Sequence, residues 1–72
     1  MTTDLMTRFV QQRPFIPFEI ITVDGRRIGI PHSDFANLEQ FAAAVTILDA
    51  VGRAEIIETA LIVSIRTLAP LP

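Results

Sequence analysis

The most constraining feature of the chain is residues 13–35, RPFIPFEIITVDGRRIGIPHSDF, which hold three of the five prolines, two of the three glycines and the only histidine. Pro14 and Pro17 fix the backbone and remove hydrogen-bond donors, so no regular helix can run through this stretch. Asp24-Gly25 lies between two runs rich in β-branched residues, which is the strongest short-range hairpin signal. The stretch therefore predicts a small β-fold rather than a catalytic or cofactor-binding signature.

A two-residue turn at Asp24-Gly25 predicts strands over residues 18–23 and 26–30. In that register one face, which we expect to be the core side, holds Ile21, Val23, Ile28 and Ile30. The other face holds Phe18, Ile20, Thr22, Arg27 and Gly29, and Pro31 ends the second strand.

Residues 1–12 have the pattern of a helix. Thr2 or Thr3 can cap it, and Asp4 suits the positive end of the helix dipole. The apolar residues Leu5, Met6, Phe9 and Val10 fall on one face. Pro14 disfavours helical geometry at the preceding residue, so we expect the helix to end near Gln12.

Residues 34–51 leave two interpretations open. Phe35, Leu38, Phe41, Val45 and Leu48 have near-helical spacing, which fits one helix from Asp34 to Val51. The β-branched AVTIL and the loop-like DAVGR, with Gly52 at positive φ, instead favour a helical turn within 34–40 and a hairpin of 44–49 with 53–59. We prefer the hairpin, followed by a last strand over 62–68 and a tail at 69–72, where two prolines cannot continue a sheet interior.

The predicted fold is mainly β and forms a single domain over residues 1–72. An N-terminal helix is followed by a small, strongly bent, five-stranded antiparallel barrel of the SH3-like kind, closed or nearly closed.

Apolar content predicts self-association. The residues AVILMFWYC make up 50% of the chain, and its mean hydropathy is +0.46. A barrel of 72 residues cannot bury that many apolar side chains alone, so we expect a homo-oligomer.

The sequence shows no sign of export or of a membrane. The N-terminus lacks a basic region followed by an apolar core, and no apolar run approaches the roughly 20 residues that span a bilayer. We expect a cytoplasmic protein without a membrane partner. The chain has no cysteine, which excludes disulfides and thiolate metal ligands.

His32, followed by Ser33 and Asp34, invites comparison with a catalytic triad. The members of a triad converge from separate segments, so this run is better explained by a strand end and a capped turn. One imidazole with scattered carboxylates is also a weak metal shell. Glu55 and Glu58 lie on opposite faces of a strand and make a poor catalytic pair. We predict no enzyme, no cofactor and no catalytic or metal-binding residue; an enzyme using His32 with Asp34 is the least favoured hypothesis.

The charge balance gives little support to nucleic-acid binding. The net charge is -2, the pI is about 5.1, and all six cationic side chains are arginines. Binding to phosphates usually depends on a basic excess. Arg13, Arg26 and Arg27 could form a small basic edge near the hairpin, although charges on an edge strand also serve to prevent aggregation.

The patterns R-P-F-x-P-F, D-G-R and H-x-D-F resemble a group of short bacterial proteins with no assigned activity. The order of a helix, a strand ending in Val-Asp-Gly, VTIL and a final ALIVSI is similar to the Sm-like fold, Hfq-type proteins included. That resemblance implies rings formed through edge strands and RNA binding at the pore or rim. Where Hfq-type proteins carry an aromatic–Lys–His cluster, this chain has Glu58, Thr59 and Ala60. Residues 31–41 are also longer than that family allows, so none of its RNA-binding residues is transferred.

These features predict a non-enzymatic, homo-oligomeric small β-barrel that acts as a protein-interaction module, with itself and an unidentified protein as partners. The alternative is an Sm-like RNA-binding protein that uses Arg13, Arg26 and Arg27.

Overall fold

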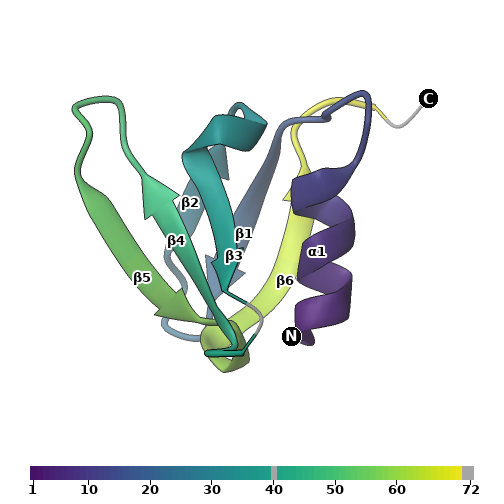
Figure 1. Cartoon of the computed structure of the whole chain (residues 1–72). Coiled ribbons are helices and arrows are strands. Elements are labelled where there is room, and N and C mark those ends of the chain that lie inside the picture. The colour runs from purple at the N-terminus through teal and green to yellow at the C-terminus, as the bar shows by residue number, and fades with distance from the viewer. Residues whose placement is uncertain (40, 71–72) are drawn as a thin grey trace.

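The computed structural model describes residues 1–39 and 41–70, which form one α-helix, two short 3-10 helices and six β-strands (Figure 1). Two three-stranded antiparallel sheets face each other: sheet A has the strand order β2-β1-β6, and sheet B has the order β3-β4-β5. The elements are α1 (Thr3–Gln11), β1 (Phe18–Thr22), β2 (Arg27–Ile30), η1 (Ser33–Phe35), β3 (Ala36–Glu39), β4 (Ala44–Leu48), β5 (Ala54–Glu58), η2 (Thr59–Leu61) and β6 (Ile62–Thr67).

The predicted N-terminal helix is confirmed. The Thr2 hydroxyl accepts a hydrogen bond from the backbone N–H of Leu5 at 3.2 Å, and Asp4 lies in the first turn. The helix buries Met6 and Val10. It lies on the side of the molecule where the edge strands β3 and β6 are found, and it packs against β3 (Figure 1). The Arg13–Pro14 peptide bond that follows it is cis.

The β1–β2 hairpin exists, but its predicted register is wrong by one residue. The strands pair Ile20 with Ile28 and Ile21 with Arg27, because the turn is one residue longer than expected. Thr22 pairs with Arg26: its N–H donates to the Arg26 carbonyl at 3.0 Å, and its carbonyl accepts from the N–H of Gly25 at 2.9 Å. With Gly25 at φ 86°, this is a three-residue hairpin loop closed by a glycine bulge.

The longer loop reverses which side chains of β1 face the core. Side chains alternate along a strand, so a slip of one residue exchanges the buried and exposed sets. Phe18, Ile20 and Thr22 are buried, whereas Ile21 is only partly buried and faces outward. Val23, expected in the core, lies in the turn with 67% of its surface exposed. The two expected core positions on β2, at residues 28 and 30, do face inward.

In the second half of the chain the hairpin, not the long helix, is correct. Strands β4, β5 and β6 match the predicted segments, and Gly52 has the expected positive φ of 85°. The helical turn is limited to η1, and the next four residues form β3, which the prediction missed. Residue 40, the last residue of the predicted helical turn, lies outside the described residues, as do residues 71–72 of the predicted tail.

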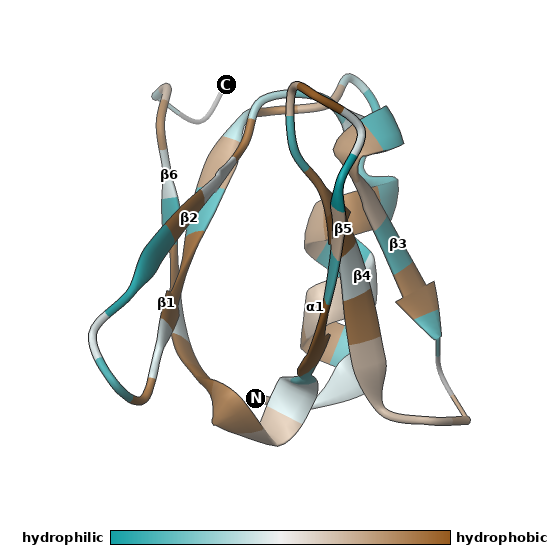
Figure 2. Cartoon of the chain, turned by 90° about the vertical axis from the view of Figure 1, so that its left-hand side faces the viewer, coloured by the Kyte–Doolittle hydropathy of each residue, from teal (hydrophilic) through white to brown (hydrophobic). Residues whose placement is uncertain are grey.

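The five-stranded barrel is not confirmed, although the mainly β fold with one N-terminal helix is. Residues 1–39 and 41–70 contain six strands rather than five, because the segment between β2 and β4 contributes β3, and these strands divide into two sheets. The 3-10 helix η2 connects β5 of sheet B to β6 of sheet A at one end (Figure 2). The core between the sheets and α1 is formed mainly by Met6, Phe18, Ile20, Ile30, Val45 and Ile62. Phe9 and Phe15 pack on Phe18 with ring centroids 5.6 and 5.8 Å from its own.

Candidate functional site

A groove of about 480 Å³ opens between the two sheets, on the side opposite to α1. The β1–β2 turn contributes Val23, Asp24 and Arg26 to its lining. Residues 55–58 of β5 and Leu61 of η2 form the other wall. Because β2 and β5 are edge strands, the groove lies where each sheet ends.

The first half of strand β5 inverts the usual pattern of side chains at Glu55 and Ile56. Antiparallel strands of small proteins usually turn apolar residues inward and polar residues outward. In β5, Glu55 lies opposite Ile47 and therefore faces the inside, whereas Ile56 lies opposite Thr46 and faces outward. Ile56 is 72% exposed, and Ile57 is the buried residue of the strand. The inversion places a carboxylate where the core would otherwise continue.

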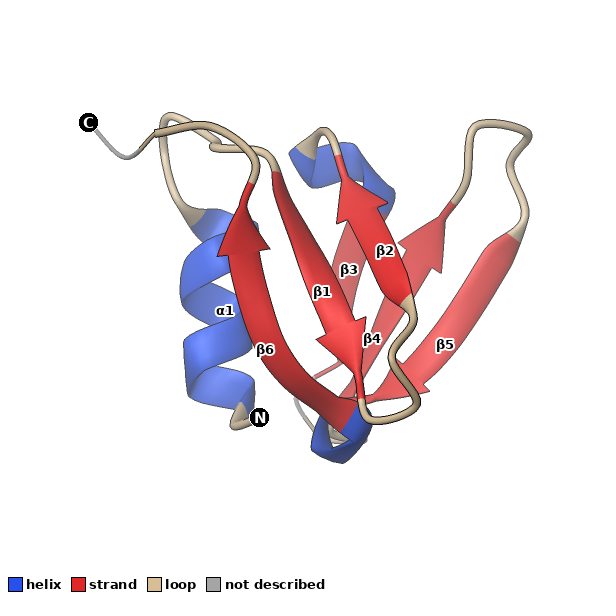
Figure 3. Ribbon diagram, turned by 180° about the vertical axis from the view of Figure 1, so that it is seen from behind, coloured by secondary structure: helices blue, strands red, loops and turns tan. Residues whose placement is uncertain are grey.

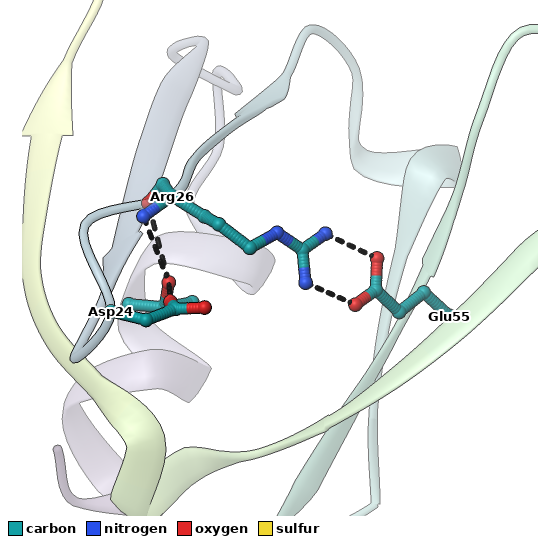
Figure 4. A network of polar contacts seen from close by, with 4 residues as sticks. Asp24, Arg26 and Glu55 are labelled. Carbon is teal, nitrogen blue, oxygen red and sulfur yellow. Dashed lines mark hydrogen bonds and ion pairs between the residues drawn. The ribbon is translucent and has the colours of Figure 1, made fainter.

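Arg26 reaches across from sheet A to hold that carboxylate (Figure 4). Its two terminal nitrogens donate to the two oxygens of Glu55 at 2.6 and 2.7 Å. Hydrogen bonding to the guanidinium lowers the pKa of Glu55 and raises the pKa of Arg26, so both groups are charged at neutral pH. The side chains of Arg26 and Glu55 are 50% and 46% exposed, respectively, so water and other ligands can reach the pair.

The turn residues fix the position of Arg26. The Thr22 hydroxyl accepts a hydrogen bond from the Arg26 backbone N–H at 3.2 Å and donates to a carboxylate oxygen of Asp24. That hydroxyl is the main cause of the lowered pKa of Asp24. The turn therefore presents one anchored arginine and one ionised aspartate at the mouth of the groove.

A second hollow of about 380 Å³ continues along β5 beyond Glu55, which lines both hollows. Its walls include Ile28 and Gly29 of β2 and residues 53–55 at the start of β5. Asp49 lies at its rim and accepts hydrogen bonds from the backbone and side chain of Arg53, at 2.9 and 2.8 Å. The backbone bond is the main cause of the lowered pKa of Asp49.

The three arginines proposed as a basic edge are not brought together. Arg13 follows α1 and precedes β1, while Arg26 follows the other end of that strand. They are thus separated by at least the length of β1. Arg27 lies opposite Ile21 on the outer face of sheet A, which is uncovered in Figure 3. Of the three, Arg26 alone lines the groove.

His32 caps η1. Its Nδ1 accepts a hydrogen bond from the backbone N–H of Asp34 at 3.2 Å and lies 3.4 Å from that residue's carboxylate. The imidazole is 60% exposed, and its centroid is 6.2 Å from the ring of Phe15. The sequence indicated Ser33 or Asp34 as the cap of this turn and His32 only as the end of the strand; in the structure His32 itself is the cap. Glu55 and Glu58 face opposite sides of β5, as predicted.

Sequence reasoning missed the role of Glu55. It was interpreted as one of several solvated carboxylates, and its partner is 29 residues away in the chain. The signal available was the order Ala-Glu-Ile-Ile-Glu, in which Glu55 shares a strand face with the core residue Ile57.

Comparisons with known proteins do not identify a relative: no family model, curated protein or solved structure matches the chain significantly. Within residues 1–39 and 41–70, no helix has the length and apolar character needed to cross a membrane. The groove itself combines exposed aliphatic side chains with ionised carboxylates, and such a surface can bind aliphatic and cationic groups.

Proposed function

We propose that the protein is a non-enzymatic, homo-oligomeric small β-barrel that acts as a protein-interaction module in the cytoplasm. The observation that carries this proposal is the outward-facing apolar strip on sheet B. Ile56 and Leu48 are 72% and 39% exposed, and Val51 at the tip of the β4–β5 turn is 74% exposed. Isolated exposed aliphatic residues are common, but a strip of them on one face indicates an interface.

Strand pairing makes these side chains neighbours. Leu48 lies opposite Ala54, and Thr46 lies opposite Ile56, so the strip runs across β4 and β5. No other element covers this face in the described part of the chain (Figure 1). Sheets pack face to face at about 10 Å, and two copies related by a twofold axis would cover each other's strip in this way.

The assignment of the fold as a small barrel of the Sm-like kind is part of the same proposal. The helix, the order of the strands and the tight connection through η2 support the interpretation of the two sheets as halves of a small bent barrel of the Sm-like kind. RNA binding by Arg13, Arg26 and Arg27 stays a prediction that no contact in the structure favours, since these side chains do not share one surface.

Sedimentation equilibrium at micromolar concentration tests the proposal. The wild-type protein is expected to have at least twice the monomer mass of 8.0 kDa. Ile56→Lys and Leu48→Lys should each give a folded monomer, because a charge cannot be buried unpaired in the contact. Val63→Lys is the matched control, since Val63 is 58% exposed but lies on sheet A. A wild-type particle of 8.0 kDa that stays soluble would refute self-association. Dissociation by Val63→Lys alone would refute the choice of sheet B.

A further inference from the structure

We propose that the two hollows along the inner side of β5, together called the slot, form a docking site for an extended segment of a partner protein that carries arginine or lysine beside aliphatic residues. The guanidinium of Arg26 is hydrogen-bonded to the carboxylate of Glu55, and such a segment would displace it. This inference goes beyond the proposed function, because self-association uses the outer face of sheet B whereas the slot opens between the free edges of β2 and β5. Ile56 and Leu48 lie at the border between the two surfaces and line the slot as well.

The first argument is the asymmetry of the fold. On one side, α1 fills the space between the sheets with Met6 and Val10, both buried. On the other side, no element of the described chain covers the slot (Figure 2). There, the edge strands β2 and β5 each have one neighbour only. An unpaired strand edge is a template for an added strand, so the slot offers backbone hydrogen bonds as well as side-chain contacts.

The second argument is charge. The slot is lined by four carboxylates and two arginines, namely Asp24, Asp49, Glu55, Glu58, Arg26 and Arg53. The remaining four acidic and four basic side chains of the chain cancel, so the slot carries the whole net charge of -2. Hydrogen bonds lower the pKa of Asp24, Asp49 and Glu55, which keeps these carboxylates ionised at neutral pH. The complementary partner is therefore cationic.

The third argument is the apolar lining of the first hollow. Val23 and Leu61 are 67% and 45% exposed, and the N–H of Val23 donates to the Leu61 carbonyl at 2.8 Å. This bond fixes the two side chains relative to each other beside Asp24. An extended segment alternates its side chains, so it can place an aliphatic residue here and basic residues on the carboxylates.

The ion pair itself shows how Glu55 would hold a ligand. Its two oxygens accept two parallel hydrogen bonds from the guanidinium of Arg26, which is the geometry of arginine recognition. The pair is about half exposed, and exposed pairs contribute little to stability. A guanidinium of a partner can therefore replace that of Arg26 at small cost. Removing Arg26 should release Glu55 and strengthen binding.

The test uses a fluorescein-labelled hexapeptide of alternating valine and arginine, blocked at both ends, and measures anisotropy at low salt. We expect saturable binding that weakens with added salt. Arg26→Ala should tighten binding about twofold to fivefold, and Glu55→Gln should weaken it by a similar factor. Glu58 faces away from Glu55 at the end of β5, so Glu58→Gln should weaken binding less than Glu55→Gln. Glu39→Gln removes the same charge from β3, outside the slot, and should weaken binding less.

Several outcomes would overturn the proposal. These are the absence of binding, equal binding of a peptide of alternating valine and glutamate, weaker binding by Arg26→Ala, or saturable binding of a single-stranded RNA in place of the peptide. Thermal unfolding of each variant verifies that it is folded. Ile56 and Leu48 line the slot as well as the apolar strip, whereas Val51 belongs to the strip but lines neither hollow. Val51→Lys should therefore weaken self-association and retain peptide binding, so loss of self-association and loss of peptide binding are separate results.

Discussion

The carbonyl oxygen of Ala43 accepts two hydrogen bonds from Thr59, one from the backbone N–H at 2.8 Å and one from the hydroxyl at 3.0 Å. Thr59 begins η2 and is 3% exposed, so both bonds lie at the buried connection between the two sheets. Ala43 meets them with a φ of 49°, a conformation that favours glycine. The link between the sheets is thus made at the expense of a strained backbone at Ala43.

Replacing Ala43 with glycine should stabilise the protein. Glycine adopts positive φ without a steric penalty, and the carbonyl that Thr59 binds is retained. After the greater flexibility of glycine in the unfolded chain is subtracted, we expect a gain of about 0.5–1 kcal/mol in the free energy of unfolding. Urea denaturation measures it. The φ of the neighbouring Ala42 is not positive, so Ala42→Gly should destabilise by a similar amount. If both variants lose stability, the strain at Ala43 is absent.

The β1–β2 hairpin contains two glycines that can be compared, Gly25 in the loop and Gly29 in strand β2. A Cβ added at Gly25 or at Gly29 would meet no atom within 4 Å, so crowding does not distinguish them. Gly25 has a φ of 86°, whereas the φ of Gly29 is not positive. Gly25→Ala should therefore cost about 1–2 kcal/mol, and Gly29→Ala should be neutral or slightly stabilising. Thermal or urea unfolding of the two variants compares them directly. Equal losses would contradict the three-residue loop.

The register error shows what local sequence leaves open. Asp24-Gly25 correctly marked a hairpin, but Asp-Gly is compatible with both a two-residue and a three-residue loop. The longer loop places Phe18, Ile20 and Thr22 on the buried face of β1 and uses the Thr22 hydroxyl to bind the Arg26 N–H. Burial of a phenylalanine against α1 and β6 is a tertiary effect that the turn sequence does not contain.

The β4–β5 turn contains the signal that would have corrected the register. The N–H of Asp49 donates to the Arg53 carbonyl, and its side chain accepts from the Arg53 N–H, as Thr22 does with Arg26. Both loops read polar-x-x-Gly-Arg, TVDGR and DAVGR, with the glycine at positive φ. A side-chain acceptor three residues before the glycine indicates the longer loop.

The candidate site was less predictable than the fold, because it depends on a contact between the sheets. The helix and five of the six strands follow from local patterns of apolar residues, prolines and glycines. The Arg26–Glu55 pair joins a turn of sheet A to an edge strand of sheet B, and nothing in either segment indicates that the two residues are partners. The sheets must first be packed before these charges meet.

The last prediction concerns how Glu55 responds to pH. Arg26 lowers the pKa of Glu55 below its ordinary value of 4.5, so the folded protein favours the ionised form. A carboxylate with a lowered pKa contributes stability above its ordinary pKa, and that contribution is lost as the pH falls through the lowered value. The urea midpoint of the wild type should exceed that of Glu55→Gln near neutral pH, and the difference should vanish at acidic pH. Asp24 and Asp49 titrate in both proteins, so their contributions to the pH dependence largely cancel in the difference between the two urea midpoints. In an Arg26→Ala background the same Glu55→Gln comparison should lose most of its pH dependence, because the guanidinium is the main cause of the shift. A difference that persists in strong acid, or one unaffected by the loss of Arg26, would show that the two charges are not coupled in solution.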